Sequence, residues 1–307
     1  MSASRQSRAG RWLSPEQLAT VNRLELVARH VVDGYLAGMH RSSAIGASTE
    51  FAEHRSYTPG DDIRRIDWRV FGRTDRLMVK SFQAESYADV VLAIDLSASM
   101  RVGNSSLNKL QYARMLAASF AHLAVKQRDR AGIGMFDTEL RQFRRPQSVL
   151  GEAFWQILDT PPTEDATDLV TALTALTNRL HGRTMLFIVS DYYNDVGAIT
   201  EAMARLAARH DVSAIHVVDP NERSLPWDGP QVVADVETGA RVALDPALAN
   251  PALAQSFAAH SDALSRRLQS IGCDYWMVET NQPLETQLHG FLHRRGQYGR
   301  ARKGSRR

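Results

Sequence analysis

From Asp89 onward, short apolar runs alternate with longer amphipathic stretches, and this alternation constrains the fold more than any other feature of the chain. DVVLAID (89–95) and TMLFIVSD (184–191) hold few polar residues, which is typical of strands buried on both faces of a sheet. Stretches such as 107–127 and 198–210 instead place apolar residues at helical spacing. Strands that alternate with helices of this length predict βαβ units with right-handed crossovers and a mostly parallel sheet.

The pattern predicts a doubly wound, mostly parallel α/β domain over residues 87–295. Further strands are expected at 131–137, 212–219 and 273–279, and further helices at 149–159, 168–180, 251–271 and 284–295. Residues 222–245 interrupt the alternation, and we interpret them as a β-hairpin insertion turned at Glu237-Thr238-Gly239.

A smaller module is predicted over residues 14–86. Residues 15–37 have apolar side chains at roughly helical spacing, with Ser14 as the N-cap and Pro15 in the first turn. From 38 to 71 the chain is rich in Gly, Ser, Asp and Arg and lacks sustained periodicity. Residues 76–85 then resemble a strand, so we expect a helix followed by a largely irregular segment.

The composition excludes several classes of protein. With 44% hydrophobic and 23% charged residues the chain is of the ordinary globular kind. Its one cysteine, Cys273, rules out an intrachain disulfide and a cysteine-rich zinc site. No apolar run reaches the roughly 18 residues that a membrane span needs, and residues 1–13 lack the apolar core of a signal peptide, so we expect a cytoplasmic protein. A P-loop motif is missing, so the chain is not expected to hydrolyse ATP through one.

The positive charge lies at the two ends of the chain. The net charge is +3, but residues 1–13 carry three basic side chains and residues 294–307 carry seven, with no acidic residue in either segment. Without those ten charges, residues 14–293 have a net charge of −7. We interpret 1–13 and 296–307 as basic disordered tails that aid solubility. Nucleic-acid binding through the tails is an alternative, which the acidic body disfavours.

Polar side chains follow several predicted strands at the edge where ligands of open α/β sheets bind. The first strand runs into a D-x-S-x-S loop, a threonine precedes the helix at 168–180, and the strand at 184–190 ends in Ser-Asp. Carboxylate and hydroxyl oxygens suit a hard ion such as Mg²⁺ or Mn²⁺, and no His or Cys joins the set. The alternative is a structural loop in which a serine caps a helix. The candidate metal ligands are Asp95, Ser97, Ser99, Thr167 and Asp191.

These three elements resemble the metal-ion-dependent adhesion site of von Willebrand factor A-like domains. The resemblance implies that Asp95, Ser97 and Ser99 ligate Mg²⁺, that Thr167 does so directly or through water, and that Asp191 acts mostly through water. An ion with one directly bound carboxylate keeps positive charge and an exchangeable position, which a Glu or Asp of a partner can fill. A non-enzymatic, Mg²⁺-dependent protein-interaction module is therefore expected.

The front segment carries a second resemblance. Glu50-Phe51 and the run HRSYTPGDDIRRIDW (54–68) resemble the signature of domain-of-unknown-function family 58, as do VDPNERSLP (218–226) and DVETG (235–239). Members are typically encoded beside AAA+ ATPases of the MoxR group. This implies an adaptor or co-chaperone of a MoxR-type ATPase in the assembly or maturation of a client complex. From its residues alone, the 50–68 segment predicts a buried salt-bridge network, with a partner-docking surface and a second metal or catalytic site as the alternatives.

An enzymatic alternative is a metal-dependent phosphatase or phosphotransferase of the haloacid-dehalogenase type. Asp95 would then be the nucleophile at the end of the first parallel strand. That chemistry also needs a second aspartate two residues later, where this chain has Ser97, together with a positioned lysine and a later acidic pair.

Overall fold

The computed structural model describes residues 14–21, 23–42, 53–58, 63, 66–81, 87–103, 107–163, 168–234 and 241–293. These residues fall into two compact units, one that ends at Gly38 and resumes at Ala88, and one within Met39–Tyr87. The segment predicted as one N-terminal module, 14–86, is therefore divided between the two. Both predicted tails lie outside the described residues.

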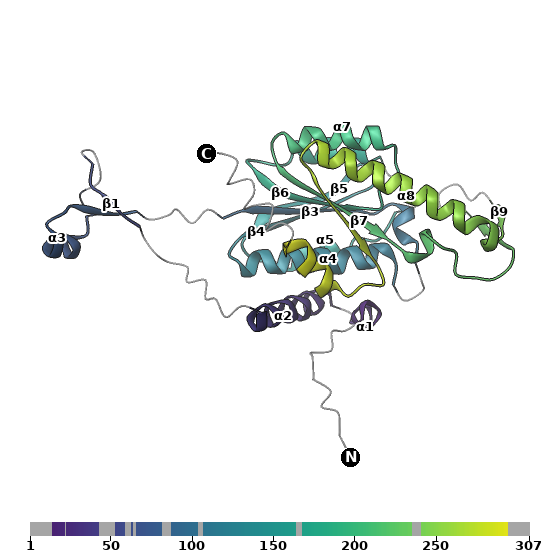
Figure 1. Ribbon diagram of the computed structural model, residues 1–307, viewed down its shortest axis with the longest axis horizontal. Coiled ribbons are helices and arrows are strands. Elements are labelled where there is room, and N and C mark those ends of the chain that lie inside the picture. Colours follow the sequence, from purple (N-terminus) through teal and green to yellow (C-terminus); the bar gives the residue numbers. More distant parts are fainter. Residues whose placement is uncertain are drawn as a thin grey trace, which may run out of the picture. The chain divides into compact units, whose positions relative to one another are not determined.

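A six-stranded sheet forms the centre of the larger unit, in the order β10-β7-β6-β3-β4-β5 (Figure 1). Every neighbouring pair is parallel except β4–β5, which is antiparallel. The strand of this sheet that comes first in the chain, β3, lies between β4 and β6, so the strand order reverses there. The predicted doubly wound, mostly parallel sheet is confirmed. The strands are β3 (Asp89–Asp95), β4 (Arg130–Phe136), β5 (Leu140–Gln147), β6 (Thr184–Ser190), β7 (Asp211–Val218) and β10 (Asp274–Glu279).

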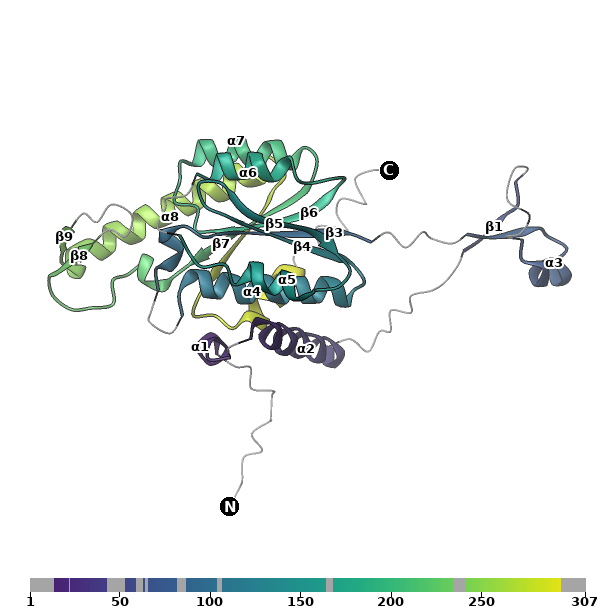
Figure 2. The same ribbon diagram turned by 180° about the vertical axis from the view of Figure 1, so that it is seen from behind.

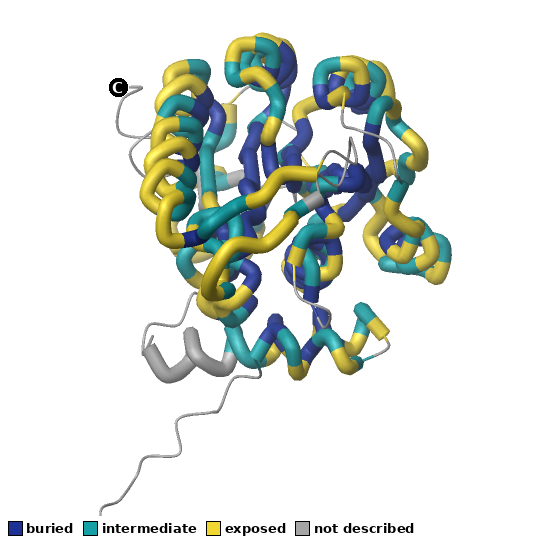
Figure 3. Tube along the Cα trace, turned by 90° about the vertical axis from the view of Figure 1, so that its right-hand side faces the viewer, coloured by how far each residue is buried: buried dark blue, intermediate teal, exposed yellow. Residues whose placement is uncertain are grey.

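Helices cover both faces of this sheet (Figures 1 and 2). One face carries α4 (Lys109–Lys126), α5 (Glu152–Leu158) and the helix over 284–293; the other carries α6 (Leu169–Thr177), α7 (Val196–Ala207) and α8 (Pro246–Ser270). Alternate residues of β3 explain the two layers, because Leu92 packs in the core with α4 whereas Ala93 packs in the core with α6 and α7. Buried segments accordingly gather at the centre, between helices with exposed outer sides (Figure 3).

The N-terminal segment forms two helices, α1 (Pro15–Ala19) and α2 (Leu24–Ser42), so the prediction of one helix over 15–37 is wrong. The predicted start is confirmed, since Ser14 and Gln17 form a reciprocal capping box and Pro15 opens the helix. The break falls where Thr20 and Val21, both β-branched, lower the helix propensity. Both helices contribute buried side chains to the core that α4 shares with the sheet, and α1 and the part of α2 up to Gly38 belong to the larger unit.

The smaller unit consists of β1 (Glu53–Ser56) paired antiparallel with β2 (Met78–Ser81), and of α3 (Trp68–Thr74). The β2 strand lies within the predicted 76–85, whereas β1 and α3 fall in the segment that was expected to be irregular. The side chain of Asp67 caps α3, and no residue of α3 is buried. Most signature residues around 59–65 lie outside the described part, so the salt-bridge interpretation stays a prediction.

The insertion before α8 is the predicted hairpin. Strand β8 (Gln231–Ala234) pairs antiparallel with β9 (Arg241–Leu244), while the expected turn at 237–239 lies outside the described residues. The edge strand β5 was not predicted at all. Among the described residues no helix is both long and apolar enough to cross a membrane.

Candidate metal centre

Asp95 occupies the carboxyl end of β3 and is completely buried. Its Oδ1 accepts a hydrogen bond from the backbone N–H of Ser97 at 2.9 Å, and its Oδ2 accepts one from the hydroxyl of Ser190 at 2.7 Å. The first donor belongs to the loop that leaves β3 and the second to the end of the neighbouring strand β6. The carboxylate is therefore fixed at the sheet edge from two sides.

The two serines of the D-x-S-x-S loop lie together. The hydroxyl oxygens of Ser97 and Ser99 are 3.1 Å apart. Ser97 is in the N-cap position of the short 3-10 helix η2 (Ala98–Arg101), yet its side chain makes no capping hydrogen bond, which argues against the helix-cap alternative for Ser97. Octahedral Mg²⁺ at 2.0–2.1 Å from its ligands places neighbouring oxygens about 2.9 Å apart. The serine pair fits that spacing.

The second predicted loop is described only at its two ends. Thr163 donates its N–H and its hydroxyl to the carbonyl oxygen of Leu96, at 2.9 and 3.2 Å, so the loop departs from beside the first one. At the far end Asp168 caps α6 through the N–H of Thr171 at 3.0 Å. Thr167 lies outside the described residues, and its role as a ligand stays a prediction.

Asp191 follows β6 directly and is almost fully buried. Because β3 and β6 are parallel neighbours, their carboxyl ends bring Asp191 and Asp95 to the same edge. Burial, and secondarily the negative charge of Asp191, raise the pKa of Asp95 to about 6. A divalent cation between the two carboxylates would relieve both effects.

The residue after Asp191 has an unusual backbone. Tyr192 has φ 54, in the left-handed region, and is completely buried. Its N–H donates to the hydroxyl of Ser190 at 3.1 Å, and its carbonyl oxygen lies 3.0 Å from Nε2 of His260 in α8. These contacts hold the turn that aims Asp191 at the sheet edge.

The sequence interpretation missed a buried cation beside this centre. Lys109, the first residue of α4, has a fully buried side chain, and its Nζ lies 2.7 Å from Oδ2 of Asp191. The same ammonium donates to Oε1 of Glu222, in the 3-10 helix η3 (Pro220–Glu222), and lies 5.2 Å from the ring centroid of Tyr193. Burial lowers the pKa of Lys109, but the two carboxylates more than offset this, so its pKa lies above the usual value. The ammonium is charged.

Part of the signal for Lys109 is visible in the sequence. Lys109 shares the helical face of Tyr112, Leu116 and Phe120, which are apolar and buried, so a lysine there calls for an acidic partner. The partners themselves lie 82 and 113 positions further along the chain. Only the assembled sheet reveals them.

The donor set suits Mg²⁺ rather than a softer ion. Within the described ranges, no group of three or more His, Cys, Asp or Glu residues is placed to hold a metal. A centre at this edge therefore depends on hydroxyl oxygens beside its carboxylates, as the Ser97–Ser99 pair provides.

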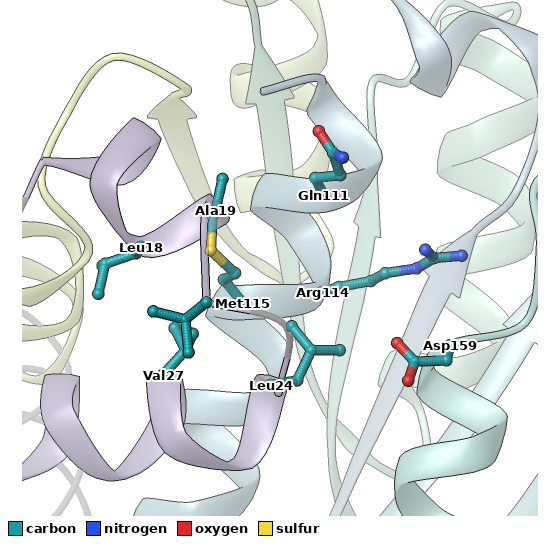
Figure 4. A pocket seen from close by; sticks show the side chains of 9 residues that line it. Leu18, Ala19, Leu24, Val27, Gln111, Arg114, Met115 and Asp159 are labelled. Atoms are coloured by element: carbon teal, nitrogen blue, oxygen red, sulfur yellow. The ribbon is translucent and has the colours of Figure 1, made fainter. Parts of the chain in front are cut away.

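A pocket of about 190 Å³ lies elsewhere, where α1 and α2 cover α4 (Figure 4). Leu18, Val27 and Met115 line its apolar part, and Arg114 and Asp159 border it on the other side. Arg114 donates to the carbonyl oxygen of Thr160. None of the candidate metal ligands lines this pocket, which is a gap between packed helices.

The sheet topology defines a doubly wound α/β domain, with the candidate centre at the carboxyl ends of β3 and β6. The chain belongs to the family described as "Protein of unknown function DUF58", whose profile matches residues 53–265. The family resemblance of the signature segments is thereby confirmed.

Curated relatives of similar length occur in mycobacteria. The "Uncharacterized protein Rv1480" of Mycobacterium tuberculosis is 30% identical over 292 residues, which cover 92% of this chain and 91% of the relative. The "Uncharacterized protein Mb1516" of Mycobacterium bovis matches with the same identity and coverage.

Solved structures with partial likeness include BatB from Bacteroides thetaiotaomicron, with 17% identity and a TM-score of 0.45 over 68% of this chain and 99% of that one. A von Willebrand factor type A protein from Catenulispora acidiphila has 11% identity and a TM-score of 0.40 over 70% of this chain and 42% of its own. The fold class follows from the strand order of the six-stranded sheet.

Proposed function

We propose that this chain is a non-enzymatic protein-interaction module whose strand-end centre binds Mg²⁺ and, through it, a Glu or Asp side chain of a partner. The ligands would be Asp95, Ser97 and Ser99, with Thr167 and Asp191 completing the set directly or through water. The observation that carries the proposal is the 3.1 Å hydroxyl pair of Ser97 and Ser99 next to the buried carboxylate of Asp95.

The chemistry follows from the charges at the centre. The bound ion would supply a Lewis-acidic position for an anionic oxygen. Asp95 would be the one directly bound carboxylate, since Asp191 already shares an oxygen with Lys109. Neutral serine hydroxyls leave part of the ion's positive charge uncompensated, so a partner carboxylate is attracted to it.

Family membership supports the choice of partner. We propose that the chain acts as an adaptor or co-chaperone of a MoxR-type AAA+ ATPase, which would assemble or mature a client complex. The client or the ATPase would supply the carboxylate.

The test is affinity capture from native lysate in Mg²⁺ and in EDTA, with the parent chain, Asp95→Ala and Asp89→Ala. Asp89 is a matched control, because it begins the same strand and pairs with the half-exposed Arg130 at 2.6 Å. Partners should be retained by the parent and by Asp89→Ala in Mg²⁺ only, and lost by Asp95→Ala. Circular dichroism should show that all three chains are folded.

Capture that is equal in EDTA and in the Asp95 variant would contradict the metal-dependent interface. Titration of the parent with Mn²⁺, monitored by electron paramagnetic resonance, tests the centre without any partner. If the parent chain binds no Mn²⁺ at millimolar concentration, with or without added acetate, the proposal of a metal centre is wrong.

A further inference from the structure

A buried lysine lies beside the candidate centre, at a helix position that does not favour a cation by itself. Lys109 opens α4, and a helix N-terminus carries partial positive charge that disfavours a cation. Burial of an ammonium is costly unless it is paired. Apolar side chains in place of the lysine and its acidic partners together would fill the same space at no such cost, so this buried group of charges needs an explanation.

The contacts of Lys109 join three of the loops at the sheet edge. Its backbone follows the loop from β3, its ammonium lies 2.7 Å from Oδ2 of Asp191 after β6, and it also donates to Glu222 after β7. Glu222 is fixed in turn, because its Oε2 accepts the N–H of Asp219 at 2.9 Å. One positive charge is thus held rigidly between a candidate metal ligand and a further carboxylate.

We propose that Lys109 is a fixed counter-charge that limits how tightly the centre binds a divalent cation and keeps the cation-loaded centre receptive to an anionic partner group. This inference rests on the proposed function. The carboxylates of Asp95, Asp191 and Glu222 give three negative charges, and Lys109 reduces the formal charge to −2. A divalent cation then brings it to zero.

Without the lysine, the formal charge of the cation-loaded centre is different. Three carboxylates and a divalent cation leave a formal charge of −1, which repels a partner carboxylate. The ammonium also engages Oδ2 of Asp191, so that one oxygen of this side chain is left for the cation or for its water. Lys109 therefore lowers the intrinsic affinity of the centre for the metal ion and raises the affinity of the metal-loaded centre for an acidic ligand.

Mn²⁺ titration of three single variants tests the first half of the proposal. Lys109→Met keeps the length of the side chain without its charge and should bind Mn²⁺ about tenfold more tightly than the parent. Glu222→Gln makes the centre less negative and should bind it more weakly. Lys126→Met is the control: Lys126 ends the same helix and pairs with Asp33 at an exposed site, so its variant should match the parent.

The double variant Lys109→Met/Glu222→Gln separates charge from geometry. It restores the formal charge of −2 and removes both members of the contact, so its Mn²⁺ affinity should return toward that of the parent. Acetate tests the second half, as a stand-in for the partner carboxylate at constant ionic strength. Acetate should strengthen Mn²⁺ binding by the parent more than by Lys109→Met.

The Mn²⁺ titrations can contradict the role of Lys109 without contradicting the metal centre. If the parent binds Mn²⁺ and the folded Lys109→Met chain binds it no more tightly, the counter-charge role is overturned while the centre stands. If the Lys109 variant is unfolded, an unchanged affinity in Glu222→Gln overturns the role instead. If neither the parent nor any variant binds Mn²⁺, the centre fails and the inference fails with it.

Discussion

The two carboxylates of the candidate centre are buried to a similar extent but have different partners. Asp95 accepts hydrogen bonds from neutral donors, the N–H of Ser97 and the hydroxyl of Ser190. Asp191 instead contacts the ammonium of Lys109. Burial raises the pKa of Asp95, so its negative charge is the poorly compensated one. An external cation would therefore compensate Asp95, whereas Asp191 already has an internal one in Lys109.

Removal of the internal cation should have the largest effect on stability. In EDTA, Lys109→Met leaves Asp191 and Glu222 buried without their cation, and the free energy of unfolding should fall by about 3–5 kcal/mol. Urea unfolding measures this loss. The exposed pair of Lys126 is the control, and Lys126→Met should cost at most about 1 kcal/mol. A loss below 1 kcal/mol for Lys109→Met would mean that the two sides of the centre do not differ.

Asp95 should make the free energy of unfolding depend on pH. A folded-state pKa of about 6, against an ordinary value of 3.8, means that the folded chain binds this proton more tightly than the unfolded chain. In EDTA the contribution of Asp95 to stability should therefore be greatest below pH 4 and fall, by about 3 kcal/mol, as the pH rises through 6. Other groups titrate in the same range, so the measurement is the difference between the parent and Asp95→Asn.

Asp95→Asn should lack this component of the pH profile, and saturating Mg²⁺ should stabilise the parent more at pH 7.5 than at pH 5. Parallel pH profiles for the parent and the variant would show that Asp95 is already compensated.

A smaller loss of unfolding free energy is expected when a neutral hydrogen-bond donor to Asp95 is removed. Ser190→Ala deletes the hydroxyl that donates to Asp95 and accepts from the N–H of Tyr192, and it should cost about 1–3 kcal/mol in urea unfolding. Ser265→Ala is the matched control, because its hydroxyl takes part in an exposed hydrogen bond and its loss should stay within about 0.5 kcal/mol.

Ser99→Ala should have the smallest effect on stability. The half-buried hydroxyl of Ser99 contacts Ser97, and its removal in EDTA should change the unfolding free energy by about 0.5 kcal/mol or less. The Mn²⁺ affinity should nevertheless fall by about tenfold, because the ion loses an oxygen ligand. Unchanged affinity would exclude Ser99 from the centre and leave the contrast between Asp95 and Asp191 as one of stability alone.

The strands of the core were predictable because each is buried on both faces. β3 and β6 carry continuous apolar runs, and β7 is mostly apolar with only Ser213 and His216 between its buried apolar residues. β5 was missed for the opposite reason, since this antiparallel edge strand is largely exposed, contains Pro146 and three arginines, and has no apolar run.

Some residues of the candidate centre were likewise predictable from the sequence, and others were not. The D-x-S-x-S loop and Asp191 follow directly from strand ends, and parallel strands bring their carboxyl ends to one edge. Lys109 and Glu222 could not be paired from the sequence, because what joins them is the packing of α4 and η3 against that edge and not a local pattern.

The long sequence separation of the Lys109 contacts has a consequence for the newly made chain. The ammonium can pair with both carboxylates only after α4, β6 and the segment that follows β7 have come together, so we expect the centre to form late in folding. A chain released before residue 222 would hold a buried lysine with one of its two acidic partners missing. A partner that recognises this edge would thereby bind finished molecules and pass over truncated or half-folded ones.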